Sequence, residues 1–260
     1  MTNSVKDPGA RLKRSDESVF KRLTRQQLFI PIAALVLLVL FNLIADPSFF
    51  AVSIKENSLG NPVLSGNIIS VLDNASELVI LAIGMTLVTA SSGGQDISVG
   101  ATMAIAGSVI LRMVCGGQIT ADTMQTSLIL AVLIGIVVTA CFGAFNGVLV
   151  AYFKIQPMVA TLIMYTAGRS IAAWINNNQL PIINDVRFKY AGAFLPGVPV
   201  PTPIFITLFI ILVFWLILKF TNLGLYTQSV GINANSSRLN GLDPKLIKLL
   251  TYVVLGVCVA

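Results

Sequence analysis

The sequence has 260 residues, of which 55% are hydrophobic and only 11% are charged, with a formal net charge of +6. Soluble domains carry about 25% charged residues, so 17 basic and 11 acidic side chains are too few to cover a water-exposed surface. Together with a mean hydropathy of +0.85, this composition excludes an ordinary soluble domain. It indicates a protein whose apolar side chains face a lipid bilayer.

Residue types that carry chemistry are scarce. The chain has no histidine, which is the commonest metal ligand and a frequent general base. Its three cysteines, Cys115, Cys141 and Cys258, lack C-x-x-C spacing, so neither a zinc site nor a disulfide framework is indicated. A G-x-x-x-x-G-K-[ST] phosphate-binding loop is also absent from the sequence. We therefore expect a chain that is not an enzyme and has no metal or cofactor of its own.

The N-terminal segment, residues 1–26, is strongly basic. Its basic residues are Lys6, Arg11, Lys13, Arg14, Lys21, Arg22 and Arg25. Such a flank favours the cytoplasmic side of a membrane, where its charges lie near the anionic leaflet. We expect a cytoplasmic tail over 1–26 and a transmembrane domain over 27–260.

Seven apolar segments follow, and a transmembrane helix needs about 20 predominantly apolar residues. They are 28–45, 68–90, 97–111, 127–153, 155–175, 203–218 and 249–260. The pattern predicts an all-α membrane protein, a polytopic bundle of transmembrane helices. The last segment, about 18 Å long at 1.5 Å per residue, is too short to cross a 30 Å core. We expect the chain to be a fragment of a longer protein, or its last segment to be covered by a partner.

The basic residues predict the orientation of the spans. With a cytoplasmic tail and alternating spans, the inner loops hold twelve basic residues and the outer loops hold four. The inner set adds Lys154, Lys219, Arg238, Lys245 and Lys248 to the tail, and the outer set is Lys55, Arg112, Arg187 and Lys189. This bias follows the positive-inside rule, so the basic balance indicates topology in a lipid bilayer and gives no reason to expect nucleic acid binding.

Three charged residues lie within the predicted spans. Asp73 and Glu77 lie roughly 8 Å and 14 Å below the outer boundary at Ile68, and Arg169 lies roughly 9 Å below the same surface, at 1.5 Å per residue. Charges inside a bilayer need partners. One interpretation is an ion pair or triad among these residues, and the other is that each extends separately into an outer vestibule.

A polar break, S-S-G-G-Q-D-I-S-V-G over residues 91–100, interrupts the apolar pattern. Gly93 and Gly94 allow the helix to unwind, and Asp96 is expected to cap a helix that begins at Ile97. The break is either a tight loop between two spans or a broken or re-entrant segment that lines a solute path. The candidates for the path are Gln95, Asp96 and Ser98.

The segment 127–153 carries small residues at every fourth position. They are Gly135, Thr139, Gly143, Gly147 and Ala151, and such a stripe is typical of a face on which another helix approaches closely. Asn146 lies beside the stripe and either bonds a partner helix or contacts a solute hydroxyl. We favour helix packing for this face and keep Asn146 as a fourth candidate for the path.

The predicted inner loop 219–248 is long and contains helix-capping signals. Asn233 is expected to cap a short helix over 234–240, and Gly241 suits the left-handed position that ends it. Asp243 then caps a helix with Pro244 at its first position, which continues into the bilayer. A short helix joined rigidly to a span is either a lever that transmits motion from a cytoplasmic partner or a connector on the membrane surface.

At these residues the sequence resembles the permease subunits of bacterial binding-protein-dependent ABC sugar importers, the ribose, xylose and galactofuranose group. That family's central segment reads close to G-M-T-x-V-x-x-x-G-G-I-D-L-S-V-G. The stretches that match are GMTLV (84–88), GGQDISVG (93–100), FNGVLVA (145–151), IQPMVATL (155–162), GR (168–169), VGIN (230–233), RLNG (238–241) and KLLTY (248–252). The galactofuranose-type permeases are the most similar in these motifs.

The resemblance implies a bacterial inner-membrane subunit that imports a small sugar, a pentose or hexose such as a galactofuranose-like one. It implies a second permease subunit, identical or different, a periplasmic sugar-binding protein, and an ATP-binding subunit that alone carries ATP and Mg²⁺. It also assigns the region 230–241 to docking on the ATPase. The coupling candidates are Gly231, Asn233, Ser236, Ser237, Arg238 and Gly241.

The sequence departs from the family pattern at several positions. Gln95 replaces an apolar residue, which makes the break more polar, and Ser236 and Ser237 stand where alanines are usual, which weakens a short helix. The family's C-terminal spans are missing. Two alternatives therefore stay open: an ion-coupled secondary transporter, and a truncated remnant of a permease that transports nothing.

Overall fold

A computed structural model describes residues 29–56 and 62–260, so the predicted tail 1–26 lies outside the described residues. The described residues form two compact units. The first comprises residues 29–52 and 66–68, and the second comprises 53–56, 62–65 and 69–260.

The first unit holds helix α2 (Phe29–Ala45) and the short 3-10 helix η2 (Pro47–Phe50). Asp46 lies between them and caps η2, because its carboxylate accepts a hydrogen bond from the backbone N–H of Ser48 at 3.0 Å. Helix α2 is apolar on all sides and buries none of its side chains. A helix of this kind needs lipid or other helices around it.

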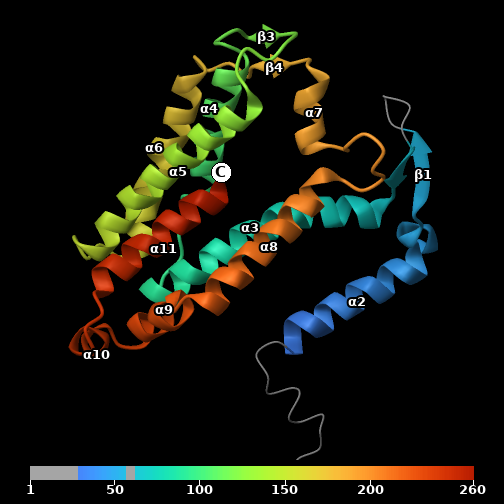
Figure 1. The fold of residues 1–260 in the computed structure, drawn as a ribbon. Coiled ribbons are helices and arrows are strands. Elements are labelled where there is room, and N and C mark those ends of the chain that lie inside the picture. Colours follow the sequence, from blue (N-terminus) through green and yellow to red (C-terminus); the bar gives the residue numbers. More distant parts are fainter. Residues whose placement is uncertain (1–28, 57–61) are drawn as a thin grey trace, which may run out of the picture. The chain divides into compact units, whose positions relative to one another are not determined.

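The second unit is built mainly of helices, coloured by position along the chain in Figure 1. The helices are α3 (Asn67–Ser92, in this unit from residue 69 onward), α4 (Val99–Val114), α5 (Leu128–Ala151), α6 (Pro157–Ile175), α7 (Val186–Gly192), α8 (Thr202–Phe220), α9 (Leu223–Ile232), α10 (Ala234–Leu239) and α11 (Pro244–Val259). The strands are β1 (Ser53–Glu56) and β2 (Pro62–Ser65), which pair antiparallel, and β3 (Thr120–Ala121) and β4 (Ile182–Ile183), which pair parallel.

Among the described residues, each predicted apolar segment contains one helix. Four helices are long and apolar enough to cross a bilayer: α3, α5, α6 and α8. Helices α2 and α4 are apolar and shorter. The prediction of an all-α membrane bundle is therefore confirmed, and the four short strands lie in the connections.

The core of the second unit lies where α4, α5, α6 and α11 pack together (Figure 1). The small-residue stripe of α5 is buried, and α11 lies along it. A methyl group on Gly143 would overlap the carbonyl oxygen of Tyr252, and one on Gly256 would overlap that of Thr139. The predicted close helix approach is confirmed, since no side chain fits between these two backbones.

Helix α3 is tied to two other helices by polar contacts. Near its C-terminal end, the hydroxyls of Ser91 on α3 and Thr251 on α11 lie 2.8 Å apart and are both buried. In its N-terminal half, the carbonyl of Ser76 accepts a hydrogen bond from the hydroxyl of Thr207 on α8 at 3.0 Å. These bonds hold α3 against α11 and α8, because a hydroxyl between apolar helices has no water to bond instead.

The connection after α6 is held by Asp185, the N-cap of α7. Its carboxylate accepts from the backbone N–H groups of Arg187 and Met124 and pairs with the Arg187 guanidinium at 2.9 Å. The hydrogen bonds and charge of Arg187 hold the pKa of this carboxyl well below its ordinary value. The hydrogen bond from Met124 joins the segment that carries β3 to the segment that carries β4.

Candidate functional site

The polar break between α3 and α4 folds into a buried hydrogen-bonded cluster. The Asp96 carboxylate is only 6% exposed and accepts from the backbone N–H of Ser98 at 2.7 Å and from its hydroxyl at 2.6 Å. The amide of Asn146 on α5 donates to the Ser98 hydroxyl oxygen at 2.9 Å and to Asp96 at 3.5 Å. Three of the four predicted path residues, Asp96, Ser98 and Asn146, are thus brought together.

Beside the cluster is a space of about 10 Å³, lined by Asp96, Ser98, Asn146 and Tyr252. A volume of this size holds about one water molecule. The Asn146 amide oxygen and the Tyr252 hydroxyl are buried and have no hydrogen-bond partner among the described residues. In this conformation the cluster is closed to any solute larger than water.

Two details differ from the sequence-based expectation. Helix α4 begins at Val99, with Ser98 as its N-cap, rather than at Ile97 with Asp96 as the cap. Asp96 instead closes a turn onto Ser98, because its oxygen reaches the N–H two residues on. Gln95 is exposed and lies outside the cluster.

The break lies near the end of the bundle that carries α10. A side chain on Gly94 would collide with Pro157, the first residue of α6. In addition, the N–H of Ile97 donates to the hydroxyl of Thr161 at 3.0 Å. The break is therefore packed against the start of α6 and is not a free loop.

The structure does not bring the three charged span residues together. Arg169 is exposed, donates to the Tyr165 hydroxyl at 3.2 Å and lies 5.5 Å from that ring. Asp73 is half-buried and Glu77 is exposed. Within residues 29–56 and 62–260 no ion pair joins Arg169 to Asp73 or Glu77, so the described residues do not form the ion pair or triad of the first interpretation.

The segment 233–244 has the predicted capped geometry. The Asn233 side chain accepts from the N–H groups of Asn235 and Ser236, both at 3.0 Å, and starts α10. Gly241 has φ +83°, the left-handed conformation that follows a helix end. Asp243 accepts from the N–H of Lys245 at 2.9 Å and starts α11, with Pro244 at its first position. Helix α10 is thus joined to α11 by a short, hydrogen-bonded turn.

The six coupling candidates fall into two groups. Gly231, Asn233, Ser236, Arg238 and Gly241 are exposed. Ser237 is buried, and its hydroxyl donates to the Asn233 carbonyl at 3.0 Å, so it holds α10 together from inside. Gly231 also has a packing role, because a methyl group there would overlap the Ala90 carbonyl of α3.

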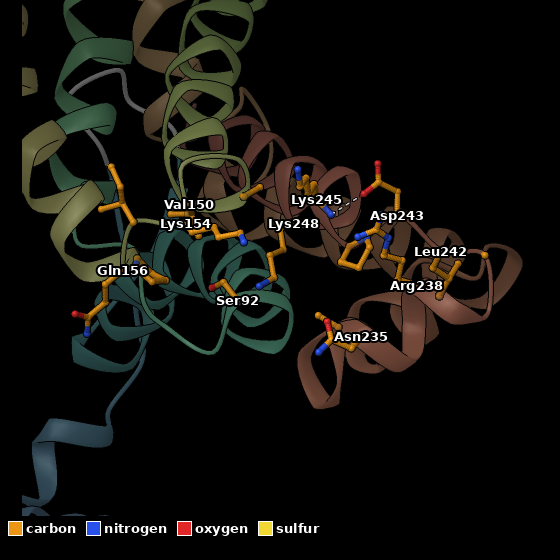
Figure 2. A pocket seen from close by; sticks show the side chains of 16 residues that line it. Ser92, Val150, Lys154, Gln156, Asn235, Arg238, Leu242, Asp243, Lys245 and Lys248 are labelled. Atoms are coloured by element: carbon orange, nitrogen blue, oxygen red, sulfur yellow. Dashed lines mark hydrogen bonds between the residues drawn. The ribbon is translucent and has the colours of Figure 1, made fainter.

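Helix α10 lies between two cavities. One, of about 670 Å³, is lined by residues of α9 and α10 that include Tyr226, Ser229, Ile232 and Ser236. The other, of about 780 Å³, lies between α10, the first turns of α11, the α5–α6 turn and the end of α3. Figure 2 shows the polar and basic side chains that line this second space, which we call the basic cleft.

The basic cleft contains cations that the sequence marks chiefly as topology signals, of which Arg238 is also a coupling candidate. Its cationic members are Lys154, Arg238, Lys245 and Lys248. They come from segments almost 100 residues apart, so only their shared inner-loop position connected them in the sequence. The sequence also carries no signal for Thr251, whose hydroxyl contacts that of Ser91, or for Tyr252, which lines the space beside the polar cluster, because both residues continue an apolar helix.

Comparison with known proteins places the chain in a family. A family model described as the permease component of a branched-chain amino acid transport system matches residues 67–260. The chain belongs to this permease family. This permease is accordingly a multi-pass membrane protein, in agreement with its four long apolar helices.

Several relatives of this permease are named for sugars. The galactofuranose transporter permease protein YtfT of Escherichia coli (strain K12) is 37% identical over 234 residues, which cover 88% of this chain and 63% of the relative. The fructose import permease protein FruF of Bifidobacterium longum (strain NCC 2705) is 32% identical, with 94% and 66% covered. The ribose import permease protein RbsC of E. coli (strain K12) is 30% identical, with 86% and 64% covered.

The resemblance to the ribose, xylose and galactofuranose group is confirmed by these relatives. The chain spans slightly less than two thirds of the length of the curated relatives it matches. No solved structure matches it.

Proposed function

We propose that this chain is the permease subunit of an ABC importer and forms part of the translocation path for a small neutral sugar. The observation that carries the proposal is the rigid connection from α10 into α11, with α11 packed along the small-residue face of α5. The names of the relatives, which include galactofuranose, fructose and ribose permeases, supply the class of solute.

The mechanism follows from this connection. Force applied to α10 passes through the short turn at Gly241 into α11. Helix α11 contacts α3 through the Thr251–Ser91 bond and closes over the Asp96–Ser98–Asn146 cluster. A shift of α11 would therefore open the polar cluster at the same time as it moves α3. Two helices packed backbone to backbone move as discrete units, since interdigitated packing does not deform continuously.

The proposed importer function also predicts the partners of this chain. A cytoplasmic ATP-binding subunit would dock on α10 and bind ATP and Mg²⁺, while this chain would bind neither. Two apolar side chains, Ile232 at the end of α9 and Leu239 at the end of α10, are 86% and 90% exposed and suit burial in that subunit. A second permease subunit and a periplasmic sugar-binding protein complete the importer, in the inner membrane of a bacterium with residues 1–26 in the cytoplasm.

Crosslinking tests the docking of an ATPase subunit. Ser236 is exposed on α10, and we choose it instead of Ser237 because Ser237 is buried. The variant Ser236→Cys, in a Cys141→Ser background that removes the exposed native thiol, should crosslink to a co-expressed ATP-binding subunit. Leu180→Cys, on the exposed segment next to β4, is the control and should give no crosslink. Absence of a crosslink at Ser236→Cys under every nucleotide condition contradicts the proposal.

A second candidate, an ion-coupled secondary transporter, is favoured by one observation, the buried Asp96 carboxylate. Uptake of radiolabelled ribose, fructose and galactose by cells that express the complete transport system separates the two. An ABC importer loses uptake when ATP is depleted and keeps it when the ion gradients alone are dissipated. The opposite result assigns the chain to the secondary transporters.

A further inference from the structure

The basic cleft concentrates positive charge where the chain supplies almost no negative charge. Four cationic side chains line it, and Asp243 is its one acidic member. The Asp243 carboxylate already accepts the N–H of Lys245 at the start of α11. Among the described residues, no ion pair involves Lys154, Arg238, Lys245 or Lys248. Lys248 is half-buried, and a partly desolvated cation without a counter-charge favours an anion beside it.

The cleft is also shaped for a ligand. Its volume of about 780 Å³ lies within the range of about 300–1,000 Å³ that is usual for small-molecule sites. Figure 2 shows Lys154 and Lys248 extending from different elements into the same space as Ser92. Lys154 lies in the α5–α6 turn and has φ +57°. The turn therefore holds its backbone in the left-handed conformation. Three separate elements thus direct cations to one place.

The cleft lies at the depth of the lipid headgroups. The α5–α6 turn directly joins two membrane-length helices, so it lies at a membrane surface. Tyr152 in this turn is exposed, and the Lys245 ammonium lies 5.3 Å from its ring. Tyrosine and lysine together are typical of the interfacial region. The cleft is also lined by apolar residues, Val150, Ala151 and Ile155. Val150 and Ala151 are buried, and exposed apolar side chains lie next along the chain, at Phe153 in the turn and Met158 in the first turn of α6.

From these observations we infer that the basic cleft binds the phosphate headgroup of an anionic phospholipid, with the acyl chains along α5 and α6. Cations beside apolar lining residues match an amphiphile, and basic pockets between transmembrane helices bind such headgroups. An acidic segment of a soluble partner would need no apolar lining at membrane depth. The inference does not rest on the proposed transport function, because it uses only the cavity, its charges and its depth.

The lipid next to α10 would act on the connection between α10 and α11. Arg238 belongs to α10, whereas Lys245 and Lys248 belong to the first two turns of α11. A phosphate that contacts both elements would hold them at one relative position. The anionic lipid content of the membrane would then bias the position of α10 relative to α11.

The test is a lipid titration of the purified chain in neutral maltoside micelles, with bound lipid counted by native mass spectrometry. We expect phosphatidylglycerol to be retained in preference to zwitterionic phosphatidylcholine, and retention to fall as salt is raised. At about 1 kcal/mol per basic residue near the surface, Lys154→Gln with Lys248→Gln should weaken phosphatidylglycerol binding about thirtyfold. The matched control is Lys189→Gln with Lys219→Gln, which removes two cations that do not line the cleft and should leave binding within about twofold.

Two further comparisons complete the test. Lys154→Arg with Lys248→Arg keeps both charges and should keep the lipid. Lipid binding is compared only among variants that have the same thermal unfolding midpoint. Inorganic phosphate and glycerol 1-phosphate compete only weakly if the lipid is the ligand, and they replace it fully if the site serves a free phosphate. Equal loss in the cleft and control variants, or equal retention of the two lipids, overturns the inference. So does a cleft variant that keeps the lipid and loses only a co-purified ATP-binding subunit, since that assigns the cleft to the partner protein.

Discussion

At the scale of single residues, Ser98 holds the polar break together. Its backbone N–H and hydroxyl both donate to Asp96, and its hydroxyl oxygen accepts the amide of Asn146. It thus makes the shorter of the two hydrogen bonds that connect the break to Asn146 of α5, the other being to Asp96. All three side chains are buried, so loss of one partner leaves the others without hydrogen bonds.

Ser98→Ala should therefore lower the stability of the fold. Removal of one hydroxyl leaves a buried carboxylate oxygen and a buried amide short of partners, which costs about 1–3 kcal/mol. A thermal unfolding midpoint in detergent below that of the parent chain would report this loss.

The control for this measurement is Ser170→Ala. Ser170 is exposed on α6, so its replacement should leave the midpoint unchanged. If Ser98→Ala alters uptake of solute while its midpoint equals that of the control, Ser98 contacts the solute and does not hold the break.

At the scale of whole elements, the α5–α11 contact determines how closely two helices approach. Small residues at every fourth position give α5 a flat face, and α11 supplies Gly256 in return. The sequence predicted the face on α5 from its spacing. It did not identify α11 as the partner, because small-residue stripes state how close a neighbour comes and not which neighbour it is.

Gly143→Ala should destabilise this contact. The added methyl group meets the Tyr252 carbonyl oxygen, which is backbone and has no alternative rotamer, so overpacking costs about 1–3 kcal/mol. Thermal unfolding of the purified variant, together with its retention as a monodisperse peak on size exclusion, measures the effect.

Gly107→Ala on α4 is the matched control. No atom lies within 4 Å of the position that its methyl group would take, so stability should be kept. An equal fall in both variants would mean that helix flexibility, rather than close approach, explains the requirement for glycine.

At the scale of the whole chain, the predicted topology requires two sets of loops to face opposite sides of the membrane. The end of α3, the α5–α6 turn and the start of α11 are all predicted inner segments, and the second unit brings them together around the basic cleft. The predicted outer segments around β3 and β4 also pair with each other. The contacts between connections therefore agree with a topology in which successive spans cross the membrane in alternating directions.

Labelling of single cysteines with a membrane-impermeant maleimide tests the absolute orientation. In a Cys141→Ser background, Leu180→Cys should react in intact spheroplasts, whereas Leu239→Cys should react only after the membrane is permeabilised. Both positions are highly exposed, at 86% and 90%, so access depends on the side of the membrane. Labelling of Leu239→Cys from outside would invert the topology.

Much of the architecture could be predicted from the sequence because it depends on local signals. Apolar run length located the helices, and Asn233, Gly241 and Asp243 marked the ends of α10 and the start of α11, where the structure has them. These signals act within four residues, so no tertiary information is needed. The start of α4 was misplaced by two residues, since Asp96 and Ser98 are both good capping residues and spacing does not choose between them.

The site depended on contacts that no local signal encodes. The sequence by itself determined a helical membrane bundle, a polar break at 91–100 and a capped helix before the last span. Only the tertiary structure decided that Asn146 meets Ser98, that Ser237 faces inward, and that Lys154 and Lys248 line one cleft. The physical reason is range: caps and apolar runs are interactions between neighbours along the chain, whereas a binding site forms where helices distant in sequence pack side by side.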